Sequence, residues 1–468
     1  MKWMKVVALL LFTSQFCFAQ TVTEKLSAAL KLLQLNPTAK HASISLYVLN
    51  SKTNEVVFDY NSQVGLAPAS CQKIVTSVAS FELLGKDYQY KTELGYDGKL
   101  KNGILDGNLY LTGYGDPTLG SWRYASTKEA VVLRKWIEAI QKAGIKSIKG
   151  SIMLNSSAFS LQPIPGGWPW EDIGNYYGAG SWGLNWYENQ YDLTLKAGTK
   201  EGGATTIMDT KPELEIAGMI NTVKTGKPGS GDNANIYLPP YSLTGFITGT
   251  VAPNKNSTIA GAIPNPLYQI QNIFSKSLKE ANIGYKDITN SFEYAANKKT
   301  VAKPDIVFYT YLSPGLDSIT YWFLRKSINL YGECILKTLA YNQTGEGTTE
   351  AGVSLVKQFW QDRGIEKSAL KVLDGSGLSP QNRITTNALV NILQYARDKP
   401  WYSAFYNALP IYNGMKIKSG TIGGTKGFAG YHTSKAGIDY TVAMIINDFD
   451  GPSSEMVKKM FLVLDELK

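Results

Sequence analysis

The two ends of this chain share a pattern that its middle lacks, and this contrast constrains the fold most strongly. Near the N-terminus, residues 22–35 have helical spacing, and residues 43–49 and 56–60 alternate like two strands of a hairpin. Near the C-terminus, strand-like runs at 416–419, 427–432 and 440–446 precede an amphipathic helix at 453–467. Both ends therefore predict parts of one α/β domain.

The middle, from about residue 88 to 263, is rich in Gly, Tyr and Trp and holds short strand-like runs such as 107–112 and 235–238. Helical patterning returns at 267–281. A chain of 468 residues exceeds one ordinary core. We therefore predict a discontinuous domain, residues 20–87 and 264–468, interrupted by a β-rich inserted module, residues 88–263, of two subdomains.

The first 19 residues have the layout of a secretory signal peptide. Lys2 and Lys5 precede an apolar run at 6–12, and a small residue, Ala19, closes the segment. No later stretch approaches eighteen apolar residues, so no integral membrane segment is expected after signal removal. We predict an exported, periplasmic protein.

Charge, cysteine and histidine content exclude several classes of function. The net charge of +9 comes from scattered basic residues, which argues against nucleic-acid binding and fits work near an anionic envelope. Cys71 and Cys334 cannot form a disulfide framework, and buried free thiols are favoured over a bridge between them. No Cys/His cluster or G-x-S-x-G motif occurs, so we expect no metal, no cofactor and no histidine-based triad.

The stretch LAPASCQKIVTS, residues 66–77, predicts a helix whose first turn holds Lys73. A cation at the positive end of a helix dipole is unfavourable by a few tenths to about 1 kcal/mol. Helical spacing lets Ser70 and Lys73 meet on one face. A serine needs a base to become a nucleophile, and a lysine can serve if desolvation or a second cation lowers its pKa. Ser70 and Lys73 therefore form a candidate nucleophile and base.

Two further motifs decide which serine matters, because S-x-x-K recurs at Ser354 and Ser368. S-x-N occurs once, at Ser327–Asn329. K-[ST]-G occurs at Lys224, in a polar stretch expected to be a surface loop, and at Lys418, on a strand-like run. Only Ser70, Ser327 and Lys418 give the order S-x-x-K, S-x-N, K-[ST]-G, which is the motif set of penicillin-binding proteins and β-lactamases.

Longer motifs extend this resemblance over nearly all of the chain after the signal peptide. They are DGSGLS at 374–379, GNLYL at 107–111 with GDPT at 115–118, and NYY at 175–177. With them the chain resembles the class C low-molecular-mass penicillin-binding proteins, the D-alanyl-D-alanine carboxypeptidase/endopeptidases of penicillin-binding protein 4 type. The resemblance implies an α/β (α+β) transpeptidase domain of the penicillin-binding and serine β-lactamase type, an antiparallel sheet with flanking helices.

The resemblance also implies roles. Ser70 attacks the D-Ala-D-Ala carbonyl, Lys73 takes its proton, Ser327 relays a proton from a helical segment, and Asn329 binds the substrate amide. Lys418 supplies positive potential, and Ser419, Gly420 and Thr421 contact the substrate, with a Ser419 or Thr421 hydroxyl on the terminal carboxylate. The backbone N–H groups of Ser70 and Thr421 form the oxyanion hole. Ser419 stands where the family often has Thr, and Tyr114 where it often has Gly.

The implied partners are peptidoglycan stem peptides and β-lactam antibiotics. Asp116 either binds the amine of a stem-peptide side chain or caps a turn before Pro117. A β-lactamase-like hydrolase and a non-catalytic penicilloyl-binding sensor are the alternatives. The sequence leaves open the balance of carboxypeptidase and endopeptidase activity, the preferred stem peptide, the role of the insertion and the oligomeric state.

Overall fold

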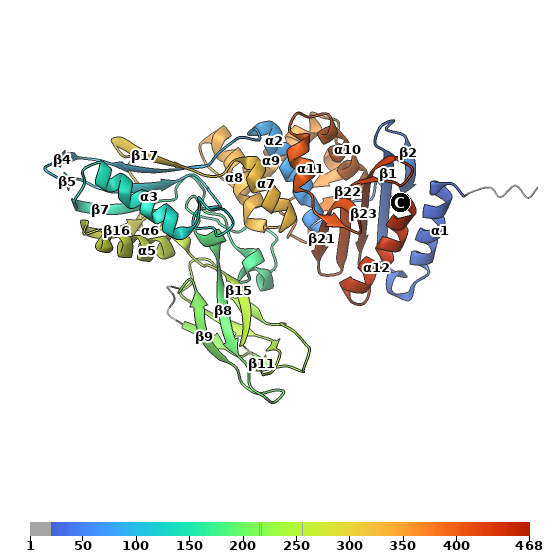
Figure 1. Ribbon diagram of the computed structural model, residues 1–468, viewed down its shortest axis with the longest axis horizontal. Coiled ribbons are helices and arrows are strands. Elements are labelled where there is room, and N and C mark those ends of the chain that lie inside the picture. The colour runs from blue at the N-terminus through green and yellow to red at the C-terminus, as the bar shows by residue number, and fades with distance from the viewer. Residues whose placement is uncertain (1–19, 215, 217, 255) are drawn as a thin grey trace, which may run out of the picture.

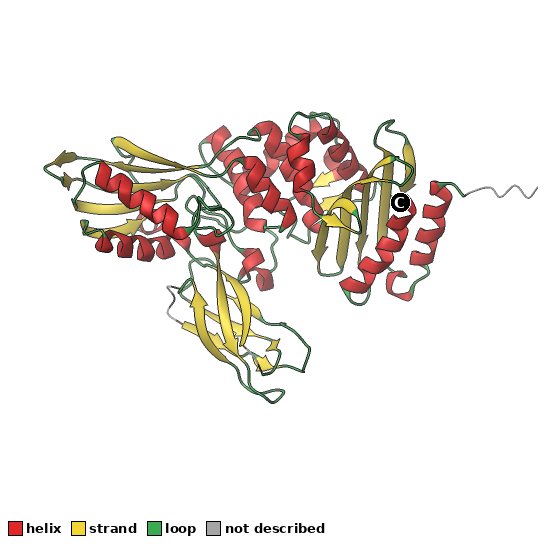
Figure 2. Ribbon diagram, viewed as in Figure 1, coloured by secondary structure: helices red, strands yellow, loops and turns green. Residues whose placement is uncertain are grey.

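The computed structural model describes residues 20–468 apart from 215, 217 and 255, so the predicted signal peptide lies outside the described residues. The chain forms an elongated molecule (Figure 1). A mixed α/β domain containing both ends of the described chain lies on one side, a second sheet with helices lies on the other, and a small β domain projects from between them (Figure 2). No helix in the described part of the chain is long and apolar enough to span a membrane.

The first sheet is antiparallel and has the order β2-β1-β23-β22-β21-β20. Its strands are β1 (Ser43–Asn50), β2 (Val56–Tyr60), β20 (Ile411–Tyr412), β21 (Met415–Ile422), β22 (Thr425–Thr433) and β23 (Asp439–Asn447). β1 pairs with β23 along its whole length, with Leu46 opposite Met444. The predicted N-terminal hairpin and the three C-terminal strands thus lie in one sheet.

Helices cover both faces of this sheet, which explains why its central strands are apolar on both sides. Leu46 and Val48 pack with helices α1 (Val22–Gln34) and α12 (Ser453–Leu464), whereas Tyr47 and Leu49 belong to the larger helical core. The helices of that core are α2 (Lys73–Leu83), α7 (Leu316–Arg325), α8 (Asn329–Thr344), α9 (Thr349–Gln361), α10 (Thr386–Arg397) and α11 (Tyr402–Ala408). This arrangement is the predicted antiparallel sheet with flanking helices.

The second sheet has the order β17-β3-β6-β7-β5-β4, and β16 also pairs with β7. Its strands are β3 (Lys91–Tyr96), β4 (Lys99–Lys101), β5 (Ile104–Asp106), β6 (Leu109–Gly113), β7 (Ser147–Asn155), β16 (Gly284–Asn290) and β17 (Ile306–Leu312). Helices α3 (Glu129–Lys142) and α5 (Pro266–Glu280) meet through an edge-to-face contact between Trp136 and Phe274. The short helix α6 (Ser291–Ala296) follows β16.

The predicted boundary of the insertion at residue 263 is therefore wrong. Helix α5 and strands β16 and β17 follow that residue in the chain but belong to the second sheet and its core, so the insertion extends to Leu312. Helical periodicity correctly indicated a helix at 267–281, but periodicity gives the type of an element and not the sheet against which it packs.

The small β domain holds the rest of the insertion. One sheet joins β15 (Asn256–Ala262), β8 (Gln190–Lys196) and β9 (Thr206–Lys211), and another joins β10 (Gly218–Asn221), β13 (Thr244–Thr248) and β12 (Asn235–Tyr237). A short ladder joins β11 (Lys224–Thr225) and β14 (Thr250–Val251). These strands enclose their own core, which includes Tyr191, Leu193 and Ile247. The remaining short elements are α4 (Trp170–Ile173), β18 (Leu370–Lys371) and β19 (Arg383–Ile384).

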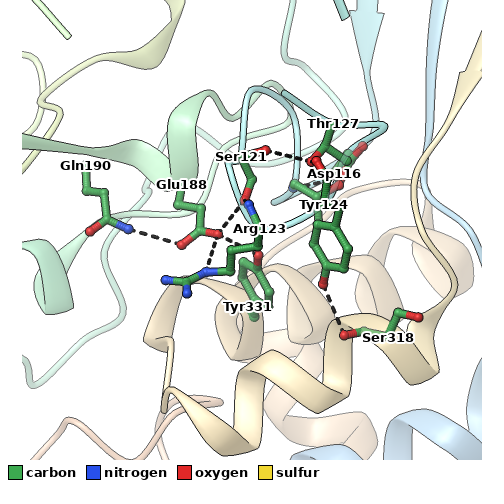
Figure 3. A network of polar contacts seen from close by, with 10 residues as sticks. Asp116, Ser121, Arg123, Tyr124, Thr127, Glu188, Gln190, Ser318 and Tyr331 are labelled. Atoms are coloured by element: carbon green, nitrogen blue, oxygen red, sulfur yellow. Dashed lines mark hydrogen bonds and ion pairs between the residues drawn. The ribbon is translucent and has the colours of Figure 1, made fainter. Parts of the chain in front are cut away.

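A buried polar network fastens the insertion to helix α8 (Figure 3). Glu188 is 1% exposed, and its Oε1 accepts hydrogen bonds from Ser121 Oγ and Tyr331 Oη at 2.7 and 2.8 Å. Arg123 Nε lies 2.7 Å from the same oxygen. Because a buried carboxylate must be paired and hydrogen-bonded, these groups fix Glu188 of the insertion on Tyr331 of α8.

Candidate active site

The Ser70–Lys73 segment folds into two different kinds of helix. Residues Ala69–Gln72 form a single 3₁₀ turn, and α2 begins only at Lys73. No side chain caps the start of either element, so Ser70 does not act as an N-cap. Its Oγ instead lies 2.8 Å from Lys73 Nζ. The turn thus brings the hydroxyl to the amine, as the S-x-x-K spacing predicted.

The surroundings of Lys73 suit a neutral amine. Its side chain is fully buried, and Nζ lies 2.6 Å from Asn329 Oδ1 and 2.7 Å from the Ser376 carbonyl oxygen. Burial, and then the charge of Lys418, lower the pKa of Lys73 well below its ordinary value. A neutral amine has two N–H donors and one lone pair. The two carbonyl oxygens take both donors, which leaves the lone pair for the Ser70 proton.

The S-x-N residues lie where α7 and α8 join. Ser327 has a φ of 57° in the link between these helices, so the expectation that it lies on a helical segment is wrong. Asn329 is the first residue of α8. Its Nδ2 donates to the Tyr177 carbonyl oxygen at 2.8 Å while its Oδ1 faces Lys73. The amide is thereby held at both ends, and one N–H is left over.

The K-S-G residues lie on β21 beside the 3₁₀ turn. Lys418 is buried, which lowers its pKa to about 8, and its Nζ donates to the Ser419 carbonyl oxygen. A Cβ on Gly420 would lie 2.5 Å from the Pro68 oxygen and 3.0 Å from Ser70 N, so this strand position admits only glycine. The half-buried Ser419 and the exposed Thr421 lie two residues apart on the same strand.

Ser70, Ser327, Asn329 and Thr421 all line one cleft of about 570 Å³. Part of the cleft comes from the insertion, namely Pro169, Glu171, Asp172, Tyr176 and Tyr177. The remaining lining residues are Lys326, Gly377, Leu378, Pro380, Ile422 and Gly423. Sequence reasoning assigned none of these five residues to the site, although the NYY motif at 175–177 was a usable signal.

Two buried acids behind Lys73 were also missed. Asp374 is buried and accepts hydrogen bonds from Gln72 Nε2 at 2.8 Å and Trp168 Nε1 at 2.9 Å, besides backbone donors of its own loop. Glu333 accepts from Gly375 N, and burial raises the pKa of its carboxyl to about 8. Together they hold the loop that presents the Ser376 carbonyl to Lys73. The DGSGLS motif contains Asp374, whereas no motif in the sequence indicated Glu333.

Asp116, which was predicted either to bind substrate or to cap a turn, lies outside the lining of the cleft. It is 0% exposed. Its Oδ1 accepts from Thr118 N at 2.8 Å and from Thr118 Oγ1 at 2.6 Å, which is the turn-capping alternative. Burial raises the pKa of Asp116 to about 6. Sequence could not distinguish the alternatives because both need a carboxylate beside a turn.

The competing motif copies lie away from this arrangement. Lys224 is exposed on β11, Ser354 is exposed on α9, and Ser368 is exposed in a short 3₁₀ turn. Cys71 and Cys334 are free and buried. Among residues 20–468, without the three undescribed positions, no group of His, Cys, Asp and Glu side chains could hold a metal ion.

Comparison with known proteins gives consistent matches. A family model described as D-Ala-D-Ala carboxypeptidase 3 (S13) family matches residues 26–466. A D-alanyl-D-alanine carboxypeptidase of Actinomadura sp. (strain R39) is 23% identical over 457 residues, covering 92% of this chain and 82% of that protein. The D-alanyl-D-alanine carboxypeptidase DacB of Haemophilus influenzae is 23% identical over 430 residues, covering 87% and 86%.

Solved structures agree at the level of the fold. The crystal structure of penicillin binding protein 4 (dacB) from Haemophilus influenzae matches with a TM-score of 0.78 at 21% identity, covering 94% of this chain and 97% of that chain. The same protein complexed with a β-lactam matches with a TM-score of 0.72. These matches confirm the resemblance drawn from the motifs.

Proposed function

Because the chain belongs to the D-Ala-D-Ala carboxypeptidase 3 (S13) family, we propose that it cleaves D-Ala-D-Ala termini of peptidoglycan stem peptides through an acyl-enzyme on Ser70. This proposal is supported above all by the position of Lys73. Its amine lies 2.8 Å from Ser70 Oγ and is hydrogen-bonded to two carbonyl oxygens. A desolvated lysine in that position is a competent general base.

The first half-reaction transfers the acyl group to the protein. Ser70 Oγ attacks the carbonyl between the two D-alanines as its proton passes to Lys73. The N–H groups of Ser70 and Thr421 stabilise the oxyanion, a contribution of about 3 kcal/mol for a single donor. The bond to the terminal D-alanine then breaks, and its amine takes the proton through Ser327. Water subsequently hydrolyses the ester on Ser70 and restores the hydroxyl.

The charges and donors around the cleft support the remaining assignments. The charge of the buried Lys418 acts on Lys73 and helps to keep that amine neutral. Thr421, on the exposed end of β21, offers a hydroxyl for the terminal carboxylate of the substrate, with Ser419 on the same strand. The spare N–H of Asn329 is available for the substrate amide.

The wider proposal concerns where the protein acts and on what. We propose that residues 1–19 direct export to the periplasm, that β-lactams acylate Ser70, and that D-Ala cross-links are cleaved as well as termini. A penicillin is a fitting reagent because a β-lactam bound to the Haemophilus influenzae structure shows that this fold accommodates one.

A fluorescent penicillin tests the acyl-enzyme. Wild type is expected to be labelled covalently with the adduct on Ser70, Ser70→Ala is expected to take no label, and Ser354→Ala is the matched control that keeps it. An adduct on another residue, or label that persists in Ser70→Ala, contradicts the proposal. Rapid release of hydrolysed penicillin from wild type would instead favour a β-lactamase, and labelling without any cleavage of D-Ala-D-Ala peptides would favour a sensor.

A further inference from the structure

Residues 163–180, which we call the wall loop, form the insertion's side of the cleft. The loop carries all five insertion residues that line it, from Pro169 to Tyr177. Its two ends meet, because Ser181 N donates to the Pro163 carbonyl oxygen at 3.0 Å. The wall loop therefore begins and ends at the same place. We call residues 162–163 and 181, where its two ends meet, the neck.

A single buried lysine on α8 holds this neck. Lys337 is 0% exposed, and its Nζ donates to the carbonyl oxygen of Gln162 at 2.7 Å and to that of Ser181 at 3.1 Å. These two carbonyls belong to the residues that flank the wall loop on either side. The same ammonium lies 5.7 Å from the ring centroid of Phe159. Lys337 thus bonds both chain segments of the neck to α8.

The charge of Lys337, which clamps the neck, is held by carbonyl oxygens and not by a carboxylate in ion-pair contact. Lys337 forms none of the ion pairs found among the described residues. The ionisable groups that face it are Glu333 and Cys334 on α8 and Glu350 on α9. Desolvating an ammonium costs several kcal/mol. The two carbonyl dipoles offset part of that cost, so the charge-assisted bonds at the neck are strong ones.

The position of Lys337 on α8 connects the neck to the candidate chemistry. Asn329 begins the same helix, two turns earlier, and its Nδ2 holds the Tyr177 carbonyl in the wall loop. The wall loop is also held by Trp168, whose Nε1 donates a hydrogen bond to the Asp374 carboxylate. Helix α8 therefore holds the wall loop at its neck through Lys337 and beside the cleft through Asn329.

We propose that Lys337 is a positioning residue that sets the wall loop against α8, and so sets the width of the cleft for the part of the stem peptide beyond the scissile bond. The inference rests on the proposed function, because it assumes that the stem peptide occupies this cleft. It predicts different effects on two kinds of substrate. A stem pentapeptide that touches the wall loop depends on Lys337, whereas a small penicillin held close to Ser70 does not.

The protonation of Lys337 gives the inference a second readout. Burial lowers the pKa of Lys337 to about 8. Above that pH the neutral amine keeps N–H donors, but the bonds to Gln162 and Ser181 lose their charge assistance. The KM of wild type for a stem pentapeptide should therefore rise between about pH 8 and pH 9.5, beyond any change in penicillin acylation over the same range.

The experiment compares Lys337→Met, which has no donor, with Lys337→Arg, which keeps a charged donor, and with the exposed Lys371→Met as matched control. For Lys337→Met we expect KM for a stem pentapeptide ending in D-Ala-D-Ala to rise about tenfold, with penicillin acylation within about twofold of wild type. Lys337→Arg should restore most of the loss and reduce the alkaline rise in KM to the part contributed by other groups such as Lys418. The control should match wild type.

Equal losses for pentapeptide and penicillin, or an unchanged KM in Lys337→Met, would overturn the inference. If Lys337→Met fails to fold, Lys337→Gln, which keeps N–H donors but carries no charge, takes its place in the same comparison, and an unchanged KM in that variant overturns the inference. Failure of the proposed function itself would look different, since wild type would then take no penicillin on Ser70 or would cleave no D-Ala-D-Ala pentapeptide.

Discussion

Replacing Gly420 by alanine tests whether the contact between β21 and the 3₁₀ turn positions the reacting serine. The added methyl carbon would lie 2.5 Å from the Pro68 oxygen and 3.0 Å from the backbone nitrogens of Ser70 and Cys71. All three are backbone atoms, so no flexible side chain can move to make room. The strand and the turn must therefore separate.

The expected loss follows from what that separation moves. Overpacking of this kind costs about 1–3 kcal/mol of stability. The proposed oxyanion-hole donors, Ser70 N–H and Thr421 N–H, lie on the two segments that are pushed apart. Loss of a single such donor lowers the rate by about 10²–10³. We expect Gly420→Ala to remain folded and to be acylated by penicillin at least about 100 times more slowly than wild type.

The assay is the second-order rate of acylation by a fluorescent penicillin, with circular dichroism to establish that the variant is folded. Gly218→Ala is the control, because a Cβ at Gly218 meets nothing within 4 Å. A folded Gly420→Ala that is acylated within about threefold of wild type would refute the reasoning, since a loss of one donor is far larger than that.

Two further predictions concern pH. The charge of Lys418 lowers the pKa of Lys73, so Lys418→Ala should slow acylation by penicillin and move the acid limb of its rate–pH profile to higher pH. Lys224→Ala should leave this profile unchanged. A profile that changes in Lys224→Ala and not in Lys418→Ala would rule out the motif assignment. Burial raises the pKa of Asp116 from 3.8 to about 6. The protonated carboxyl therefore stabilises the folded state by about 3 kcal/mol below about pH 4, and this stabilisation is lost as the pH rises through 6. Asp116→Asn should flatten the free energy of unfolding between those pH values in denaturant titrations without changing KM, and a raised KM would restore a substrate-binding role.

The sequence by itself determined the chemistry and the general fold. Ser70 and Lys73 are three residues apart, so the turn that joins them is local and their meeting follows from spacing. The order of Ser70, Ser327 and Lys418 distinguished one set of motifs from its copies. The strands at both ends were also predicted from local pattern, because short apolar runs bounded by turn residues are typical of strands whichever sheet they join.

Tertiary structure decided whatever depends on partners far away in the chain. Lys73 meets Asn329 and Ser376 across 256 and 303 residues, and Lys337 meets Gln162 across 175. Burial of Asp116 and the extension of the insertion to Leu312 likewise depend on which elements pack together. A short window of sequence records the propensity of a segment and the chemistry of its side chains. It does not record the desolvation and long-range pairing that set the pKa of Lys73 and place the wall loop beside Ser70.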